Sequence, residues 1–221
     1  MENLTRRNKE HFLQLLKRYP ELETCGDDIL QAYHALENVY RDGGKLLIAG
    51  NGGSAADSEH IVGELMKSFL IPDCTTSEFQ RSLIEVDSDL GRELAENLQH
   101  ALPAIALDGQ PALTTAFIND CNPLMSFAQQ VNGLGQSCDA FLGISTSGNS
   151  KNVAYAAVVA KARGMKVIGL TGARESTLSK IADVCVRAPH VETFMVQELH
   201  LPIYHCWCMM LEEAFFGADE S

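Results

Sequence analysis

The sequence predicts an open, doubly wound α/β domain built on a five-stranded parallel sheet. From residue 45 onward, short apolar runs alternate with segments of helical periodicity, the pattern of strand–helix–strand units with right-handed crossovers. Four of the five runs are continuously apolar, as strands covered by helices on both faces should be. The predicted strands are residues 45–49, 104–108, 140–145, 166–171 and 183–188.

Helical periodicity fills the segments between these strands and both ends of the chain. Two helices, 3–19 and 27–42, precede the first strand and cannot be crossovers. We expect this N-terminal segment, 1–44, to pack on the α/β domain or on a neighbouring subunit. Gly164 is expected to end one helix, because glycine readily adopts the left-handed conformation found there. Further helices are predicted at 54–68, 112–118, 124–132, 150–163 and 175–182.

One connection within the domain (45–216) is too long for an ordinary crossover. Residues 70–103 are interpreted as an inserted, partly helical segment, with one helix predicted over 89–100. The last segment, 193–216, has a long helical pattern. Pro202 is expected to kink or break that helix, because it lacks an N–H and its ring clashes with the preceding turn.

Composition argues against several partners. The chain has 17 Lys+Arg against 29 Asp+Glu, a formal net charge of −12, which disfavours a surface for duplex nucleic acid or anionic lipid. The longest uncharged stretch, 121–138, is too polar for a membrane span, and the N-terminus lacks the apolar core of a signal peptide. Seven cysteines without a CxxC pair indicate reduced thiols. We therefore expect a cytoplasmic protein with no nucleic-acid or membrane partner.

The first candidate site is the turn GNGGSAADSEH at 50–60, between the first strand and a helix. Backbone N–H groups of such a turn can converge on an anion at the helix N-terminus. Ser54 and Asp57 also have the spacing of a helix capping box, which would explain them without a ligand. The turn matches the dinucleotide fingerprint G-x-G-x-x-A as well. That interpretation is the weaker one, because no second strand ending in an acid follows soon after.

The second candidate site is STSGNS at 145–150, directly after the third strand. The hydroxyls of Ser145, Thr146, Ser147 and Ser150 lie at a helix N-terminus, where a single capping residue would suffice. So many donors around a glycine favour a phosphate-binding loop made of hydroxyl and amide dipoles. An acidic protein attracts an anion little at long range, so such a site must act locally, with Lys151 nearby.

The third candidate site contains potential metal ligands. His60 and Glu64 are four residues apart and share a helical face, which for an isolated pair is usually an ordinary surface contact. Gln197, His200 and His205 are polar residues in the otherwise apolar last helix, where a lone histidine is more often a core residue. Together, histidine, glutamate and glutamine side chains suit a first-row divalent metal, with imidazole favouring zinc.

These motifs, taken in order, resemble those of the bacterial phosphoheptose isomerases of the sugar isomerase (SIS) domain family. The resemblance covers residues 27–216 apart from the insertion. The motifs that carry it are GNGGSAADSEH, GELMKSF, the turn IND at 118–120, GISTSGNSKNV, KVIGLTG and VQELHLPIYH.

The resemblance implies a flavodoxin-like SIS fold and a cytoplasmic homotetramer with active sites at subunit contacts. The implied reaction converts sedoheptulose 7-phosphate to D-glycero-D-manno-heptose 7-phosphate, with Glu64 as base and His205 as acid. One Zn²⁺ per subunit is implied, bound by His60, Glu64, Gln197 and His205. The implied substrate-binding residues are Asn51, Gly52, Gly53, Ser54, Glu64, Asn119, Asp120, Ser145, Thr146, Ser147, Ser150 and Gln197.

The implied chemistry is consistent with these residue types. Moving a carbonyl between C2 and C1 requires removal of a proton, stabilisation of an enediolate and return of a proton, for which a carboxylate and an imidazole are suited. Zinc would act as a Lewis acid on the sugar oxygens. The long 70–103 segment leaves the identity of the phosphosugar open.

Two alternatives to the isomerase remain. One is a non-catalytic SIS-domain protein that regulates a partner such as a replication initiator. The other is a phosphosugar sensor without turnover. A pure adaptor has no need for Glu64, Gln197 and His205 together, which favours the isomerase.

Overall fold

The computed structural model describes residues 4–72 and 75–217, and it confirms the predicted fold class. Five strands form one all-parallel sheet in the order β2-β1-β3-β4-β5. The strands are β1 (Leu46–Ala49), β2 (Ala104–Ala106), β3 (Ala140–Ser145), β4 (Lys166–Gly172) and β5 (Val184–Ala188). Four strands match their predicted runs to within one residue at each end, and β2 ends two residues earlier than predicted.

Alternate residues of the strands enter two separate hydrophobic cores. In β1, Leu46 and Ile48 belong to the larger core, whereas Leu47 and Ala49 belong to the other. A strand repeats every two residues, so an uninterrupted apolar run supplies both faces of the sheet. This is why polar and apolar residues do not alternate along these strands.

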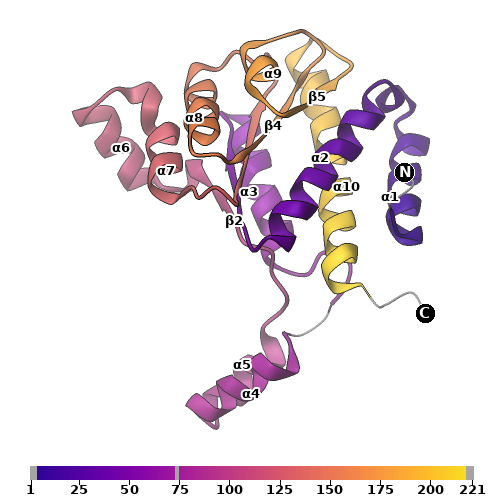
Figure 1. The fold of residues 1–221 in the computed structure, drawn as a ribbon, viewed down its shortest axis with the longest axis vertical. Coiled ribbons are helices and arrows are strands. Elements are labelled where there is room, and N and C mark those ends of the chain that lie inside the picture. The colour runs from indigo at the N-terminus through magenta and orange to yellow at the C-terminus, as the bar shows by residue number, and fades with distance from the viewer. Residues whose placement is uncertain (1–3, 73–74, 218–221) are drawn as a thin grey trace.

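Helices cover both faces of the sheet (Figure 1). The larger core contains residues of α1 (Arg6–Arg18), α2 (Gly26–Arg41), α3 (Gly53–Met66) and α10 (Thr193–Phe216). The other core contains residues of α7 (Ser126–Leu134), α8 (Lys151–Ala162) and α9 (Thr177–Ile181). The remaining helical segments outside the insertion are α6 (Pro111–Asp120), η1 (Pro20–Cys25), η2 (Leu107–Gly109) and η3 (Pro123–Met125).

The N-terminal helices pack on the α/β domain of their own chain. α1 contacts α10, and α2 contacts β5, β4 and α10. The indole Nε1 of Trp207 donates to the carbonyl oxygen of Ile29 at 3.0 Å, which ties α10 to α2. The Thr5 side chain caps α1 by accepting from the Asn8 N–H, and the predicted start at residue 3 lies outside the described residues.

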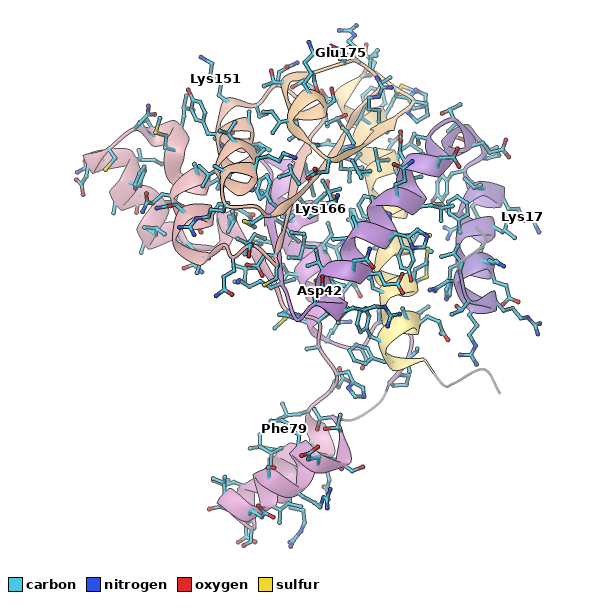
Figure 2. All side chains as sticks on the ribbon, in the orientation of Figure 1. Lys17, Asp42, Phe79, Lys151, Lys166 and Glu175 are labelled. Atoms are coloured by element: carbon cyan, nitrogen blue, oxygen red, sulfur yellow. The ribbon has the colours of Figure 1, made fainter. Side chains whose placement is uncertain are left out.

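The inserted segment forms a helical hairpin that projects from the domain. It contains α4 (Ser77–Val86) and α5 (Leu90–Asn97), and Phe79 lies on this projection (Figures 1 and 2). The sequence predicted α5 with a later C-terminus and did not predict α4. Where the chain leaves α3, the buried carboxylate of Glu212 accepts from the N–H groups of Phe69 and Leu70 at 2.6 and 2.7 Å.

Two predicted helix ends are tested by the structure. Gly164 lies just past α8 with a φ of 76°, so the predicted stop is confirmed. Of the two outcomes expected at Pro202, a break is contradicted, because α10 is one helix from Thr193 to Phe216. Pro202 is buried in that helix, whose packing against α1, α2 and α3 offsets the lost hydrogen bond. No helix within residues 4–72 and 75–217 is long and apolar enough to span a membrane.

Candidate active site

The predicted motifs meet at the carboxyl edge of the sheet. The glycine-rich turn follows β1 and the hydroxyl-rich loop follows β3, and these strands are neighbours where the strand order reverses. Open α/β sheets bind ligands in the crevice at such a switch point. The side chains of Asn51 and Asn152 exchange hydrogen bonds of 3.0 and 2.7 Å, which joins the turn to the first turn of α8.

The glycine-rich turn ends at the start of α3, but not with the expected cap. The N-cap residue is Gly52, which makes no side-chain cap hydrogen bond, and Ser54 is buried within the first turn. The predicted capping box of Ser54 and Asp57 is therefore wrong. In the first turn of α3, the N–H groups of Ser54, Ala55 and Ala56 donate to the backbone carbonyl oxygens of Asn51 and Gly52.

The hydroxyl-rich loop is a tight turn held by its own hydrogen bonds. Ser145 Oγ lies 3.1 Å from Ser150 Oγ, and Ser147 Oγ accepts from the Asn149 N–H at 3.2 Å. Gly148 has a φ of 66°, and a Cβ there would collide with the Ser176 hydroxyl. A residue with a side chain would be strained at this φ, so glycine is required to bring four hydroxyls to the N-terminus of α8.

The structure adds two basic side chains that the sequence did not single out. A cavity of about 140 Å³ beside Thr146 and Ser147 is also lined by Arg174 and His190. These residues follow β4 and β5. They come to lie beside the loop only because β3, β4 and β5 are neighbours in the folded sheet. Figure 2 shows Lys151 and Glu175 at this same edge of the molecule. The site therefore contains a guanidinium as well as dipoles.

The remaining candidates lie along the contact between α3 and α10. Gly53, Asp57, His60 and Glu64 are spaced to share one face of α3, which packs against α10. A Cβ on Gly53 would collide with the Gln197 amide, so these two residues are in contact. His60 Nε2 lies 3.2 Å from Glu64 Oε1, and the rings of His60 and His205 are 5.0 Å apart and nearly perpendicular.

Three side-chain atoms at this contact are buried without a hydrogen-bond partner: Glu64 Oε2, His205 Nε2 and Asp57 Oδ2. Lys67 Nζ is 3.6 Å from Glu64 Oε2, an ion pair beyond hydrogen-bond length. Burial lowers the pKa of the His205 imidazole below its usual value, and the nearby His60 acts in the same direction. A carboxylate oxygen and a neutral imidazole nitrogen are thus both left without a partner here.

The donor types at this contact suit a divalent metal. In a tetrahedral zinc site with ligand bonds of about 2.1 Å, two ligand atoms are about 3.4 Å apart, close to the 3.2 Å between His60 Nε2 and Glu64 Oε1. The unpartnered nitrogen of His205 is a third donor. Within residues 4–72 and 75–217, no three His, Cys, Asp or Glu side chains converge as a metal-binding group. The chemistry of the donors fits zinc, and full convergence requires side-chain movement.

Asn119 and Asp120 are placed differently from the prediction. They form the end of helix α6 rather than a turn, and they are exposed, with Asn119 donating to Asp120 at 2.8 Å. α6 lies on the opposite side of the fold from α10 (Figure 1). One chain therefore does not bring this pair together with His205.

Other side chains at the α3–α10 contact were missed. The Tyr204 hydroxyl donates to Asp57 at 3.3 Å and lies 2.9 Å from His60 Nδ1. Next to His205, a cavity of about 330 Å³ between α1 and α10 is lined by His11, Gln14, Arg18, Tyr19 and Phe69, among others. The signal for Tyr204 was its polar hydroxyl in an apolar helix. The α1 residues gave no signal, since their faces meet α10 only after folding.

Two further features lie outside this site. His200 is fully buried and hydrogen-bonds the Thr171 carbonyl at 3.3 Å, as expected for a core histidine. A cavity of about 480 Å³ lies at the amino edge of the sheet and is lined by Asp42, Lys166 and neighbouring residues. Both of these residues are labelled in Figure 2, away from Lys151. The amino edge is not where parallel sheets bind ligands.

Comparisons with known proteins agree with these motifs. Residues 84–172 match the SIS domain family. The phosphoheptose isomerase of Aneurinibacillus thermoaerophilus is 37% identical over 178 residues, which are 80% of this chain and 77% of that protein. The chain belongs to the phosphoheptose isomerase family. Phosphoheptose isomerase 2 of Campylobacter jejuni is 34% identical and aligns with 100% of this chain and 98% of its own length.

Solved phosphoheptose isomerases share the fold. The Francisella tularensis structure has a TM-score of 0.72 and 30% identity, covering 92% of this chain and 94% of its own. The Neisseria gonorrhoeae structure has a TM-score of 0.71 and 29% identity, covering 94% of this chain and 97% of its own. The resemblance inferred from the motifs is confirmed, and with it the prediction of an enzyme, a sugar-phosphate isomerase.

Proposed function

We propose that this phosphoheptose isomerase family member converts sedoheptulose 7-phosphate to D-glycero-D-manno-heptose 7-phosphate through an enediolate. The observation that carries the proposal is the pair of unpartnered buried atoms, Glu64 Oε2 and His205 Nε2, on neighbouring helices. Among the nine buried side-chain atoms without a partner in the described residues, these two belong to a carboxylate and an imidazole on helices that pack together, where a substrate could supply the partner.

Glu64 is the proposed base and His205 the proposed acid. Oε1 of Glu64 faces His60, which leaves Oε2 to remove the proton from the sugar. The lowered pKa of His205 favours a neutral imidazole at neutral pH. A neutral imidazole can polarise a carbonyl and return a proton to an enediolate, as in triosephosphate isomerase.

The phosphate is proposed to bind the loop at 145–150. Ser145, Thr146, Ser147 and Ser150 supply hydroxyls, and the N-terminus of α8 supplies unpaired N–H groups. Arg174 in the adjacent cavity adds a charge-assisted donor. The remaining substrate-binding residues are proposed from the resemblance and are Asn51, Gly52, Gly53, Ser54, Asn119, Asp120 and Gln197.

Zinc is proposed as the cofactor. His60, Glu64, Gln197 and His205 would hold it, and the donor chemistry and the 3.2 Å spacing described above support this assignment. When bound, the ion would act as a Lewis acid on the carbonyl and hydroxyl oxygens of the sugar.

We further propose that each site is completed by a neighbouring subunit of a homotetramer. From Gly53 to Glu64, the axis of α3 advances about 16 Å at 1.5 Å per residue, whereas seven carbons joined by bonds of about 1.5 Å span about 8 Å. Glu64 of one chain is therefore poorly placed for a sugar whose phosphate occupies the 145–150 loop of that chain. The position of Asn119 and Asp120 on the far side of the fold also favours shared sites.

A cytoplasmic location is proposed. The six described cysteines are all free, which suits a reducing compartment. The net charge of −12 supports a small anionic substrate bound locally rather than a nucleic-acid or membrane partner.

Substrate conversion followed by NMR tests the function. The purified chain is incubated with heptulose, hexulose and pentulose phosphates, with and without a chelator. We expect turnover of the heptulose phosphate, lost in Glu64→Gln and His205→Ala and kept in Glu59→Gln, an exposed carboxylate on the same helix. General acid–base groups contribute about 10²–10⁴-fold, so the losses should have that size. Turnover that survives both substitutions would refute the mechanism, and binding without turnover would identify a sensor.

A further inference from the structure

A chain of hydrogen bonds connects Asp57 to the candidate metal site. Tyr204 is 1% exposed, and its hydroxyl lies between two side chains of α3. It donates to Asp57 Oδ1 at 3.3 Å and lies 2.9 Å from Nδ1 of His60. The other ring nitrogen of His60, Nε2, faces Glu64 Oε1 at 3.2 Å. Four polar side chains from two helices are therefore aligned.

The number of available protons determines which group donates in each of these hydrogen bonds. The Tyr204 hydroxyl has a single proton, which it donates to Asp57 Oδ1. The tyrosine oxygen then has only lone pairs to offer His60. The hydrogen bond between them can form only if Nδ1 of His60 carries the proton.

We propose that Tyr204, anchored by Asp57, is a positioning residue that holds His60 in the tautomer protonated on Nδ1 and leaves Nε2 as a free electron pair beside Glu64. The assignment of tautomer stands on the hydrogen bonds alone. The further claim, that this tautomer favours zinc binding, rests on the proposed function.

The consequence of this tautomer lies at Nε2. A lone pair 3.2 Å from a carboxylate oxygen repels it, unless a cation binds both atoms. Without Tyr204, His60 could place its proton on Nε2 and donate to Glu64. That arrangement would satisfy both side chains and block the nitrogen as a ligand. Tyr204 thus keeps two donor atoms unpaired with each other and ready for a metal.

Packing against the buried Tyr204 ring makes this control effective. The ring of Tyr204 packs edge-on against that of His60, with centroids 5.5 Å apart, which limits rotation of the imidazole. Groups that hydrogen-bond the second nitrogen of a metal-binding histidine fix its tautomer, and their loss typically costs about 10–100-fold in metal affinity. We expect an effect of that size here.

The tautomer is measured on the full-length, ¹⁵N-labelled, metal-free chain at a pH where imidazoles are neutral. Long-range ¹H–¹⁵N spectra report which ring nitrogen carries the proton, and His60→Gln identifies the signal. The variants are Tyr204→Phe and Asp57→Ala. Tyr33→Phe is the matched control, because Tyr33 is equally buried and its hydroxyl accepts a hydrogen bond from Asn8, away from the site. Zinc affinity is measured separately, by competition with a chromophoric chelator.

We expect the proton of His60 on Nδ1 in the natural chain and on Nε2 in both variants, with zinc affinity about 10–100-fold weaker. Tyr33→Phe should change neither quantity. A proton on Nε2 in the natural chain, or an unchanged tautomer in Tyr204→Phe, would overturn the proposal. If the natural chain does not bind zinc, the cofactor assignment fails, and the tautomer in the metal-free chain still decides the role of Tyr204.

Discussion

The amides of Asn51 and Asn152 exchange two hydrogen bonds across the crevice between β1 and β3. Asn51 belongs to the glycine-rich turn, and Asn152 lies in the first turn of α8, just past the hydroxyl-rich loop at 145–150. The pair therefore joins the glycine-rich turn to the N-terminal turn of α8.

Replacing Asn152 with alanine should loosen this connection without removing a proposed substrate ligand. A hydrogen bond contributes about 1 kcal/mol, so KM for the phosphosugar should rise about fivefold, with kcat changed less than twofold. Steady-state kinetics measure both constants, and Asn38→Ala, an exposed asparagine in α2, is the control. An unchanged KM would mean that the pair has no part in placing the loop.

Shared active sites predict complementation between inactive chains. Glu64→Gln and Ser150→Ala should each be nearly inactive alone. If these residues act on one substrate from different subunits, mixing and reassembling the two chains restores about a quarter of the sites by random pairing. Activity of the reassembled mixture is compared with that of each variant treated in the same way. A mixture no more active than its components would place both residues in a single chain's site.

The core histidine His200 should make stability depend on pH. Burial lowers its pKa to about 4 in the folded chain, against 6.5 for an ordinary histidine. As the pH falls, the unfolded chain takes up the proton first, so the free energy of unfolding decreases between pH 6.5 and about 4. This loss is about 3 kcal/mol at 1.36 kcal/mol per pH unit.

His200→Gln should remove that part of the pH dependence, because glutamine does not titrate. Urea denaturation from pH 7 to 4 measures it for both proteins, and the contributions of the carboxylates cancel in the difference between them. If the free energies of unfolding of the natural chain and of His200→Gln changed equally with pH, His200 would be protonated in the folded chain or would not titrate at all.

The helical hairpin of the insertion depends on the close approach of Gly91 to α4. A Cβ there would collide with the Leu83 carbonyl oxygen and lie 2.7 Å from Ile84 Cα, both backbone atoms that cannot turn aside. Gly91→Ala should therefore separate α4 from α5. Gly133→Ala, in α7 with open space at its Cβ, is the control.

Hydrogen exchange measures this effect residue by residue. In Gly91→Ala, amides of α4 and α5 should exchange faster, while those of β3 keep their protection, because the hairpin lies outside both hydrophobic cores. Faster exchange throughout the sheet would show that the hairpin supports the domain. Substrate selectivity measured on the same variant shows whether the insertion affects the choice of sugar.

Much of this protein was determined by local sequence. The five strands, most helices and the two turns that follow β1 and β3 can be predicted from hydrophobic period and glycine placement, because these patterns report the backbone repeat of one segment at a time. Ordered motifs were also sufficient to identify the family. The same local logic did not show that α10 continues through Pro202, since the packing that keeps it continuous comes from α1, α2 and α3.

Only the tertiary structure decided which side chains meet. Asp57 had the spacing of a capping residue, yet it accepts a hydrogen bond from Tyr204, 147 positions away in the sequence. Asn119 and Asp120 had the family's motif, but α6 places them apart from His205. A side chain's partners depend on how helices distant in sequence pack together, and the pattern of one segment carries no record of that packing.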